Sequence, residues 1–242
     1  MPLETLSKYT PTELEKIVES PCPFYIPRKR VFSGIYAPAH ELATNLLAVK
    51  LQQKLKELQL KVSTEQPLKN INGRLDLKIT KGKIRLKNSG KTLAIVEIKT
   101  GGLKLVQPAC YALSEQVDVL LVSFKTGEMQ IVTPETAEKL LTKIKESLEK
   151  KEELKEENMA ILCNTCSKCA NEECGYCVGE TEKEKFEISS KIYQEKIEKI
   201  CENLDIICSK IIEYLKDKLE KEEEEVKAEI EAEAEVMVEE IL

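Results

Sequence analysis

Strict alternation of apolar and polar residues over NGRLDLKIT (72–80) is the first clear pattern along the chain. Apolar side chains take every second position, which predicts a strand with one buried face. A nearly continuous apolar run, TLAIVEIK (92–99), predicts a strand nearer the centre of a sheet. Between them KIRLK (83–87), flanked by glycine-containing turns, predicts a short strand, and two further strands are expected at VDVLLVSF (117–124) and EMQIVT (128–133).

Helical periodicity surrounds these strands. Residues 10–13 read T-P-T-E, a capping box with proline at the first helical position, and they predict a short helix that ends near Ser20. Longer helices are expected over about 39–60, 103–115 and 134–157. The order helix, three strands, helix, strand, strand, helix predicts a mixed α/β fold in which the first three strands form a meander.

From residue 184 onward the chain reads as one long helix, because apolar positions recur at steps of three and four residues. The stripe consists of Tyr193, Ile197, Ile200, Leu204, Ile207, Ile211 and Leu215. We therefore divide the chain into an α/β domain over 1–182 and a long, amphipathic, acidic helix over 183–242. This helix has three candidate roles: pairing with a second copy, docking on the α/β domain, or binding a partner.

The composition indicates a globular protein with a highly charged surface, since 42% of residues are hydrophobic and 33% are charged. Lysine and glutamate dominate the charge, which favours a thermophilic, archaeal source. No run of about 18 apolar residues and no secretion signal occur, so we expect a cytoplasmic protein without membrane contact. The net charge is −6, but eleven Glu and two Lys over 220–242 contribute −9, which leaves +3 on residues 1–219. A mildly basic body is compatible with a polyanionic ligand.

Glu97 and Lys99 share one face of the strand 92–99, because side chains alternate along a strand. We expect Asp76 on the same sheet, two strands away. Two carboxylates beside an ammonium are costly to bury unless a divalent cation compensates them. Water bound to such a cation can attack a phosphodiester. An ordinary exposed ion pair is the alternative in a chain this rich in Glu and Lys.

GRLD (73–76) followed by EIK (97–99) resembles the G-x-x-D … E-x-K signature of the RecB-like branch of PD-(D/E)XK nucleases. Gln107 and Tyr111 match the Q-x-x-x-Y helix of that family, and His40 matches its histidine before the strands. The resemblance covers about residues 10–180. It implies a restriction-endonuclease-like core of helix, three-strand meander, helix and strand, with a cysteine-cluster clasp and the long C-terminal helix added.

The resemblance also implies residue roles. It implies a Mg²⁺ or Mn²⁺ site formed by His40, Asp76, Glu97 and the backbone carbonyl of Ile98. An imidazole ligand favours Mn²⁺. Lys99 would activate water, Gln107 would orient Lys99 or a phosphate, and Tyr111 would touch a nucleotide.

The implied activity is exonuclease action on single-stranded DNA ends, in CRISPR spacer acquisition with adaptation proteins as partners, in a viral setting, or in repair. One alternative is a non-cleaving DNA-binding or partner-binding protein of the same fold. Another is a purely structural protein with a zinc site and a coiled coil.

Five of the nine cysteines lie within residues 163–177, and such clustering in a reducing compartment suggests metal binding. The resemblance extends to the CRISPR-associated RecB-type exonucleases, which hold a [4Fe–4S] cluster with one Cys before the core and three after it, commonly spaced C-x₂-C-x₅-C. The corresponding residues here are Cys22, Cys166, Cys169 and Cys174, with Cys163 and Cys177 as alternates. The C-x₄-C spacing here is one residue short, so the exact ligands stay open.

Zinc bound by the last four cysteines of the group is the competing interpretation. The iron–sulfur cluster, with Cys22 as a ligand, would close a loop of well over 100 residues, which stabilises a fold by on the order of 4–5 kcal/mol by analogy with a disulfide, whereas zinc on the last four cysteines would leave Cys22 unused. The remaining cysteines, Cys110, Cys201 and Cys208, are expected to be buried as small hydrophobic residues.

Basic residues with aromatic neighbours suit single-stranded nucleic acid, because phosphates are neutralised while bases stack. Arg28, Lys29 and Arg30 follow Phe24 and Tyr25 and are the predicted DNA-binding segment. A second basic group over 81–87 is expected to be solvated surface.

Overall fold

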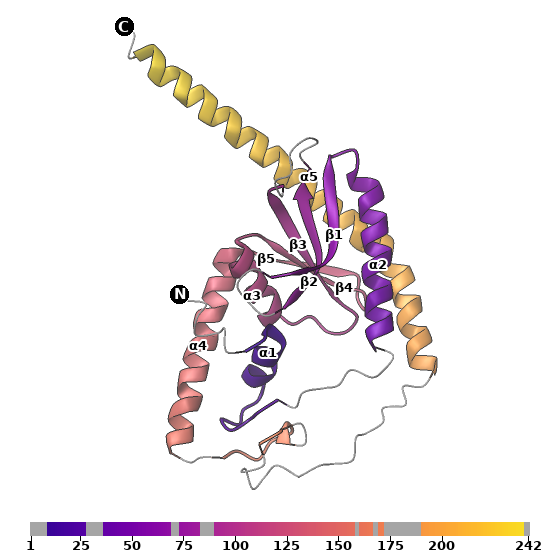
Figure 1. Ribbon diagram of the computed structural model, residues 1–242, viewed down its shortest axis with the longest axis vertical. Helices are drawn as coiled ribbons and strands as arrows, with labels where there is room; N and C mark the ends of the chain where they lie inside the picture. The colour runs from indigo at the N-terminus through magenta and orange to yellow at the C-terminus, as the bar shows by residue number, and fades with distance from the viewer. Residues whose placement is uncertain are drawn as a thin grey trace.

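The computed structural model describes residues 9–27, 36–68, 73–82, 90–157, 160–166, 169–171 and 190–239. The described residues form a single mixed sheet covered by helices on both faces (Figure 1). In chain order the elements are α1 (Pro11–Glu19), α2 (Tyr36–Leu55), β1 (Leu60–Pro67), β2 (Arg74–Lys81), β3 (Thr92–Lys99), α3 (Val106–Glu115), β4 (Val119–Ser123), β5 (Glu128–Val132), α4 (Pro134–Glu156) and α5 (Ser190–Glu239).

The sheet has the order β1-β2-β3-β4-β5. Neighbouring strands are antiparallel except β3 and β4, which run parallel. Parallel neighbours need a crossover, and α3 provides it between them. The predicted mixed α/β architecture with a long C-terminal helix is confirmed.

The three strands that form the meander are not the three that were predicted. The predicted helix over 39–60 ends at Leu55, and residues 60–67 form the edge strand β1 instead. The predicted strand 83–87 lies outside the described residues. β2 pairs directly with β3, with Leu77 opposite Val96, so Asp76 lies one strand from Glu97 rather than two.

Two groups of helices sandwich the sheet. Helices α2 and α5 pack on one face, where Leu47 and Ile207 contact the core around Val96. Helices α1, α3 and α4 pack on the other face, where Ala109 and Leu141 belong to a second core cluster. The sheet is therefore buried from both sides, which explains the continuous apolar runs of β3 and β4.

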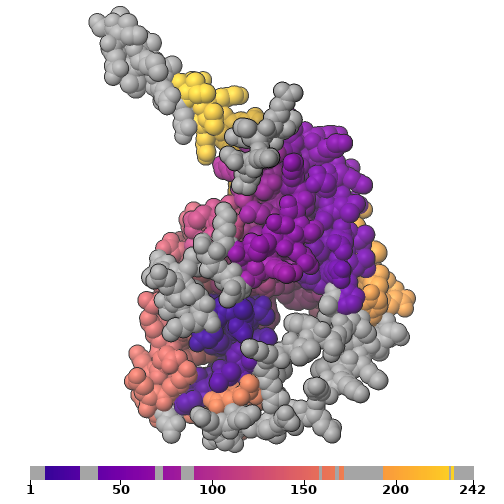
Figure 2. Space-filling view, in the orientation of Figure 1, coloured from indigo at the N-terminus to yellow at the C-terminus, as the bar shows by residue number. Residues whose placement is uncertain are grey.

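The first part of α5 belongs to this core. Of the predicted stripe, Ile200, Ile207, Ile211 and Leu215 are buried against the sheet and α2. Beyond them the helix leaves the body and projects outward, in yellow in Figure 1 and Figure 2. The first half of α5 is thus docked on the α/β domain.

Of the three unclustered cysteines, Cys110 and Cys208 are buried as expected, whereas Cys201 is exposed. The expectation for Cys201 was wrong because this residue lies outside the buried stripe of α5. Within the described part of the chain, none of the helices combines the length and apolar character needed to cross a bilayer.

Candidate active site

The predicted site residues come together at one end of the sheet, where β3 ends and the chain turns towards α3. His40 comes from α2, Asp76 from β2, and Glu97 and Lys99 from β3. The helix α3 adds Gln107 and Tyr111. The pairing of β2 with β3 and the crossover through α3 therefore position the whole group.

Asp76 and His40 form one half of the site. The Asp76 carboxylate accepts the main-chain N–H of Ile98 over 2.7 Å, and its Oδ2 lies 3.3 Å from His40 Nε2. The same Nε2 lies 3.1 Å from the carbonyl oxygen of Ile98. The hydrogen bond to Asp76 is the main cause of a raised pKa for His40, and burial opposes it.

His40 is anchored from its own helix. The hydroxyl of Thr44 lies 3.5 Å from His40 Nδ1 and donates to the His40 carbonyl over 2.9 Å. With both ring nitrogens placed in this way, the imidazole stays turned towards the end of β3. The Ile98 carbonyl and the imidazole thus lie together, as the resemblance implied.

Glu97 forms the other half and is 2% exposed. Its Oε1 accepts from Lys99 Nζ over 2.9 Å, whereas its Oε2 is buried without a hydrogen-bond partner among the described residues. Burial, and then the charge of Asp76, raise the pKa of Glu97 to about 8, although Lys99 opposes this. An unpaired buried carboxylate oxygen is unfavourable, so the site favours either a proton or a cation there.

A line of hydrogen bonds connects Lys99 to β2. Lys99 Nζ donates to Gln107 Oε1 over 2.7 Å, and Gln107 Nε2 donates to the Tyr111 hydroxyl over 2.6 Å. Tyr111 then donates to the carbonyl of Arg74 over 3.1 Å. Because each donor has its acceptor, the amide of Gln107 is held with its oxygen towards Lys99.

Tyr111 occupies a different environment from the one the resemblance implied. The residue is 2% exposed, and its ring belongs to the core cluster beneath the site. With its hydroxyl bonded to Gln107 and Arg74, it does not present a surface to a nucleotide. The spacing of Gln107 and Tyr111 placed them on one helix face correctly, but that face turns into the protein.

The donor chemistry of this group fits a divalent cation, although the side chains are not gathered into a closed centre. Within the described ranges, no three His, Cys, Asp or Glu side chains lie close enough together to hold a metal ion. Glu97 is turned to Lys99, while Asp76 is turned to His40 and Ile98. The buried, unpartnered Oε2 of Glu97 is the feature that a cation would satisfy.

Four cysteines lie in a second region, which we call the cysteine corner: Cys22, Cys163, Cys166 and Cys169. In the part of the chain that the structure describes, no three of their sulfur atoms are close enough together to hold a metal ion. Residues 26–27 run antiparallel to 169–170, with a bridge between Pro27 and Cys169 and a 2.8 Å bond from Ala170 N–H to the Ile26 carbonyl (Figure 1). This pairing brings Cys22, which follows α1, to the loop that follows α4. The predicted ligand Cys174 and the alternate Cys177 lie outside the described residues.

Two sulfur atoms of the cysteine corner, those of Cys166 and Cys169, accept main-chain hydrogen bonds. Cys169 Sγ accepts from Ile26 N–H over 3.5 Å and from Asn171 N–H over 3.4 Å. Cys166 Sγ accepts from Cys163 N–H over 3.3 Å, and the two sulfurs lie 3.8 Å apart. None of these four cysteines is in a disulfide, so sulfur ligands of the kind that bind zinc or an iron–sulfur cluster are present, although they are not gathered around one point.

The predicted DNA-binding residues Arg28, Lys29 and Arg30 lie outside the described residues, as do Lys83, Arg85 and Lys87. Of the second basic group, Lys81 is described and pairs with Glu222 of α5 over 3.0 Å. Lys91 pairs with the other oxygen of Glu222 over 2.9 Å. The base of this hairpin therefore contacts α5 where the helix leaves the body.

The sequence patterns did not identify two lysines that make contacts near the candidate sites, Lys104 and Lys151. Lys104 lies in the loop between Lys99 and α3, and its ammonium is 3.3 Å from Glu15 and 2.8 Å from Glu19 of α1. Lys151 is a buried lysine of α4 beside the cysteine corner. No local pattern distinguishes either residue, because each is one lysine in a lysine-rich chain and its contacts are remote in sequence.

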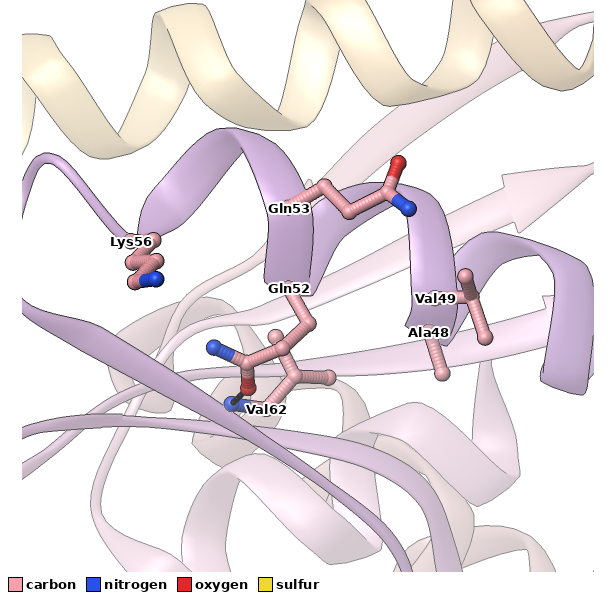
Figure 3. Close-up of a pocket in the computed structure, with 6 residues that line it drawn as sticks. All are labelled: Ala48, Val49, Gln52, Gln53, Lys56 and Val62. Carbon is pink, nitrogen blue, oxygen red and sulfur yellow. Dashed lines mark hydrogen bonds between the residues drawn. The ribbon is translucent and has the colours of Figure 1, made fainter.

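A shallow hollow between α2 and β1 lies apart from both sites (Figure 3). Its lining consists of Ala48, Val49, Gln52, Gln53, Lys56 and Val62. Gln52 accepts the main-chain N–H of Val62 over 2.9 Å, so it occupies a backbone donor of the edge strand (Figure 3). The hollow contains no group of titratable side chains, and we assign no chemistry to it.

Comparisons of the chain with known protein families, with curated proteins and with solved structures find no match.

Proposed function

We propose that this protein is a metal-dependent deoxyribonuclease with a restriction-endonuclease-like core of the RecB-like PD-(D/E)XK type. The observation that supports it best is that Asp76, Glu97 and Lys99 lie at one end of the sheet, where Glu97 Oε2 is buried without a partner among the described residues. The meander β1-β2-β3, the crossover α3 and the parallel strand β4 agree in order with the core that the resemblance implies.

His40, Asp76, Glu97 and the carbonyl of Ile98 are the groups that would hold Mg²⁺ or Mn²⁺. Bound there, the ion would polarise a phosphate and lower the pKa of a water molecule. Lys99 has three N–H donors, of which Glu97 and Gln107 take two. The remaining donor is the group we assign to orienting a water molecule or a phosphate oxygen.

Gln107 and Tyr111 act through Lys99 in this proposal. The Tyr111 hydroxyl holds the amide of Gln107, and the amide oxygen holds the ammonium of Lys99. Tyr111 is therefore a positioning residue rather than a nucleotide contact. A lysine held in this way needs little reorganisation when substrate binds, which is how enclosed polar sites accelerate reactions.

We further propose that the cysteines hold a [4Fe–4S] cluster with a structural role, with zinc as the alternative metal. The ligands inferred from the resemblance are Cys22, Cys166, Cys169 and Cys174, and Cys163 and Cys177 are alternates. Support comes from the meeting of Cys22 with the loop after α4 and from the main-chain hydrogen bonds to sulfur. Absorbance near 400 nm would distinguish the cluster from colourless zinc.

Single-stranded DNA ends are the proposed substrate, in the cytoplasm, in CRISPR spacer acquisition or DNA processing. The resemblance supports the substrate class, and the net charge of +3 over residues 1–219 is compatible with it. The projecting half of α5 is the proposed contact for a partner such as an adaptation protein or a second copy.

The decisive test is cleavage of end-labelled single-stranded DNA with Mn²⁺ by the wild type, Lys99→Ala and the control Lys125→Ala, which changes an exposed lysine. We expect Lys99→Ala to lower the rate by about 10² or more. Lys125→Ala should cleave like the wild type, and a chelator should abolish all cleavage. Equal rates for Lys99→Ala and wild type would refute the proposed role of Lys99.

One observation favours a second candidate, a protein of the same fold that binds DNA without cutting it. Glu97 is paired with Lys99 rather than gathered with His40 and Asp76. Such a protein would bind labelled single-stranded DNA in Mn²⁺ and leave it intact, and Glu97→Gln would not alter the outcome.

A further inference from the structure

The end of α1 is capped by a side chain from another helix. Lys151 of α4 is 8% exposed, and its ammonium donates hydrogen bonds to the main-chain carbonyls of Ile17 and Ser20. Ile17 belongs to the last turn of α1, and Ser20 is its C-cap. Carbonyls at a helix C-terminus lack intrahelical partners and carry partial negative charge, so a cation is favourable there.

Ser20 also connects to both parts of the cysteine corner. Its hydroxyl lies 2.7 Å from the hydroxyl of Thr165 and accepts the main-chain N–H of Cys22 over 3.3 Å. The Thr165 hydroxyl in turn lies 2.9 Å from Cys163 Sγ. Lys151 and Thr165, together with the distant Ser20, therefore join α4, the segment of Cys22 and the loop of Cys163.

The charge of Lys151 matches what a thiolate site needs. Burial is the main cause of a lowered pKa for Lys151 and the charge of Lys155 adds to it, whereas Cys22 and Cys163 act in the opposite direction. Four thiolates around Zn²⁺ or a [4Fe–4S] core carry a net negative charge, so a buried ammonium next to them offsets part of it.

We infer that Lys151, Ser20 and Thr165 form a metal-independent clasp that positions Cys22 against the loop of Cys163, Cys166 and Cys169. In this arrangement Lys151 is a positioning residue that orders the site before a metal arrives and then balances its charge. Only the charge-balancing part rests on the proposed metal site; the geometric part stands on the hydrogen bonds alone.

The test uses Lys151→Met, which removes the ammonium and keeps an unbranched chain in the buried position, with Lys150→Met as the matched control on the exposed side of α4. Alkylation of each cysteine is timed by mass spectrometry in metal-free, reduced protein. We expect Cys22 to react about tenfold faster in Lys151→Met, the change that follows from losing a hydrogen bond to a charged group. Buried Cys110, on α3, is the internal reference and should react as in the wild type.

A second pair separates the clasp from simple packing. Thr165→Val removes the hydroxyl and keeps the shape, whereas Thr165→Ser keeps the hydroxyl. We expect faster Cys22 alkylation in Thr165→Val and near wild-type behaviour in Thr165→Ser. This pair also decides the matter if Lys151→Met fails to fold by circular dichroism. Wild-type alkylation of Cys22 in both Lys151→Met and Thr165→Val, or in Thr165→Val alone if Lys151→Met is unfolded, would overturn the inference.

Metal retention gives an independent readout. Iron and zinc per chain are measured by elemental analysis, together with the half-time of release to a chelator. Release should be faster in Lys151→Met and Thr165→Val than in Lys150→Met. A wild type that binds neither metal would contradict the proposed metal site and the charge-balancing role, while the alkylation result would still decide the geometric clasp.

Discussion

The carboxylate of Asp76 accepts the main-chain N–H of Ile98 over 2.7 Å, between the two candidate catalytic residues Glu97 and Lys99. Asp76 therefore has a structural contact in addition to its proposed role as a ligand. The two roles depend on different properties, because the hydrogen bond needs an acceptor and a divalent cation needs a charge.

Asp76→Asn and Asp76→Ala should separate these roles. The amide oxygen of asparagine can still accept the Ile98 N–H, so unfolding in urea should change by less than about 1 kcal/mol, whereas alanine should cost about 1–3 kcal/mol. Both variants should lose Mn²⁺-dependent cleavage. Cleavage retained by Asp76→Asn would mean that the charge of Asp76 is not needed for the reaction.

The stability of metal-free protein should fall as the pH rises from about 5 to 8. Glu97 has its pKa raised by burial to about 8, so the folded state keeps a proton that the unfolded state releases near 4.5. His40 acts in the same direction, because its raised pKa contributes stability below 6.5 that is lost as the pH rises through the folded value. Each pH unit in this window should cost up to about 1.4 kcal/mol for each of the two groups that differs in protonation between the folded and unfolded states.

Urea unfolding in the presence of a chelator at several pH values measures this slope. Glu97→Gln should flatten most of it, since glutamine has no proton to release. A slope that is the same in Glu97→Gln as in the wild type would show that another group carries the pH dependence.

Manganese should stabilise the protein more at pH 8 than at pH 5. A metal ligand must be deprotonated, and the raised pKa of Glu97 makes the proton a competitor at the lower pH. At a Mn²⁺ concentration about 100 times Kd, the free energy of unfolding should rise by about 2.7 kcal/mol. Thermal unfolding with and without Mn²⁺ measures the difference, and Asp76→Asn, which removes a proposed ligand charge, should respond far less.

Tyr111→Phe should slow cleavage without weakening DNA binding. The change removes the hydroxyl between Gln107 and Arg74 and leaves the buried ring in place. We expect a rate about tenfold lower and a stability loss of about 1–2 kcal/mol, the cost of buried polar groups that lose a partner. Tyr193→Phe, on α5, is the control. Fluorescence anisotropy with labelled single-stranded DNA should give an unchanged Kd, and a weaker Kd would restore the idea of a nucleotide contact.

The two halves of α5 should respond differently to truncation of apolar side chains. Ile207 is fully buried, so Ile207→Ala should cost about 2–5 kcal/mol. Val226 is 53% exposed on the projecting half, and Val226→Ala should stay within about 0.5 kcal/mol. Equal costs in urea unfolding would mean that the projecting half is covered in solution.

The sequence predicted most clearly those elements whose burial follows a simple period. Alternation identified β2, a continuous apolar run identified β3, and the stripe through Ile207 and Ile211 marked the docked face of α5. The strand β1 was missed because only Leu60, at its start, is buried, as is common in an edge strand. Its residues therefore show no alternation.

For the candidate site, the order and spacing of the residues predicted the correct helix or strand for each of them. They did not predict what surrounds each side chain. Gln107 and Tyr111 lie four residues apart on one helix face, yet nothing in that spacing tells whether the face meets solvent or β2. The partners of Lys151 are more than 130 residues away in sequence, so only tertiary packing identifies it. Sequence patterns thus identified residues on helices and strands that have a clear apolar period. They missed residues whose role depends on contacts between different elements.

The contact between Gln52 and the Val62 N–H has a consequence for self-association. The outer strand of an open sheet is a template on which a strand from another molecule can add, and its unsatisfied amides are where such growth begins. By engaging one of these amides from α2, Gln52 makes β1 a poorer template, which would help to keep the molecules separate at high concentration or temperature.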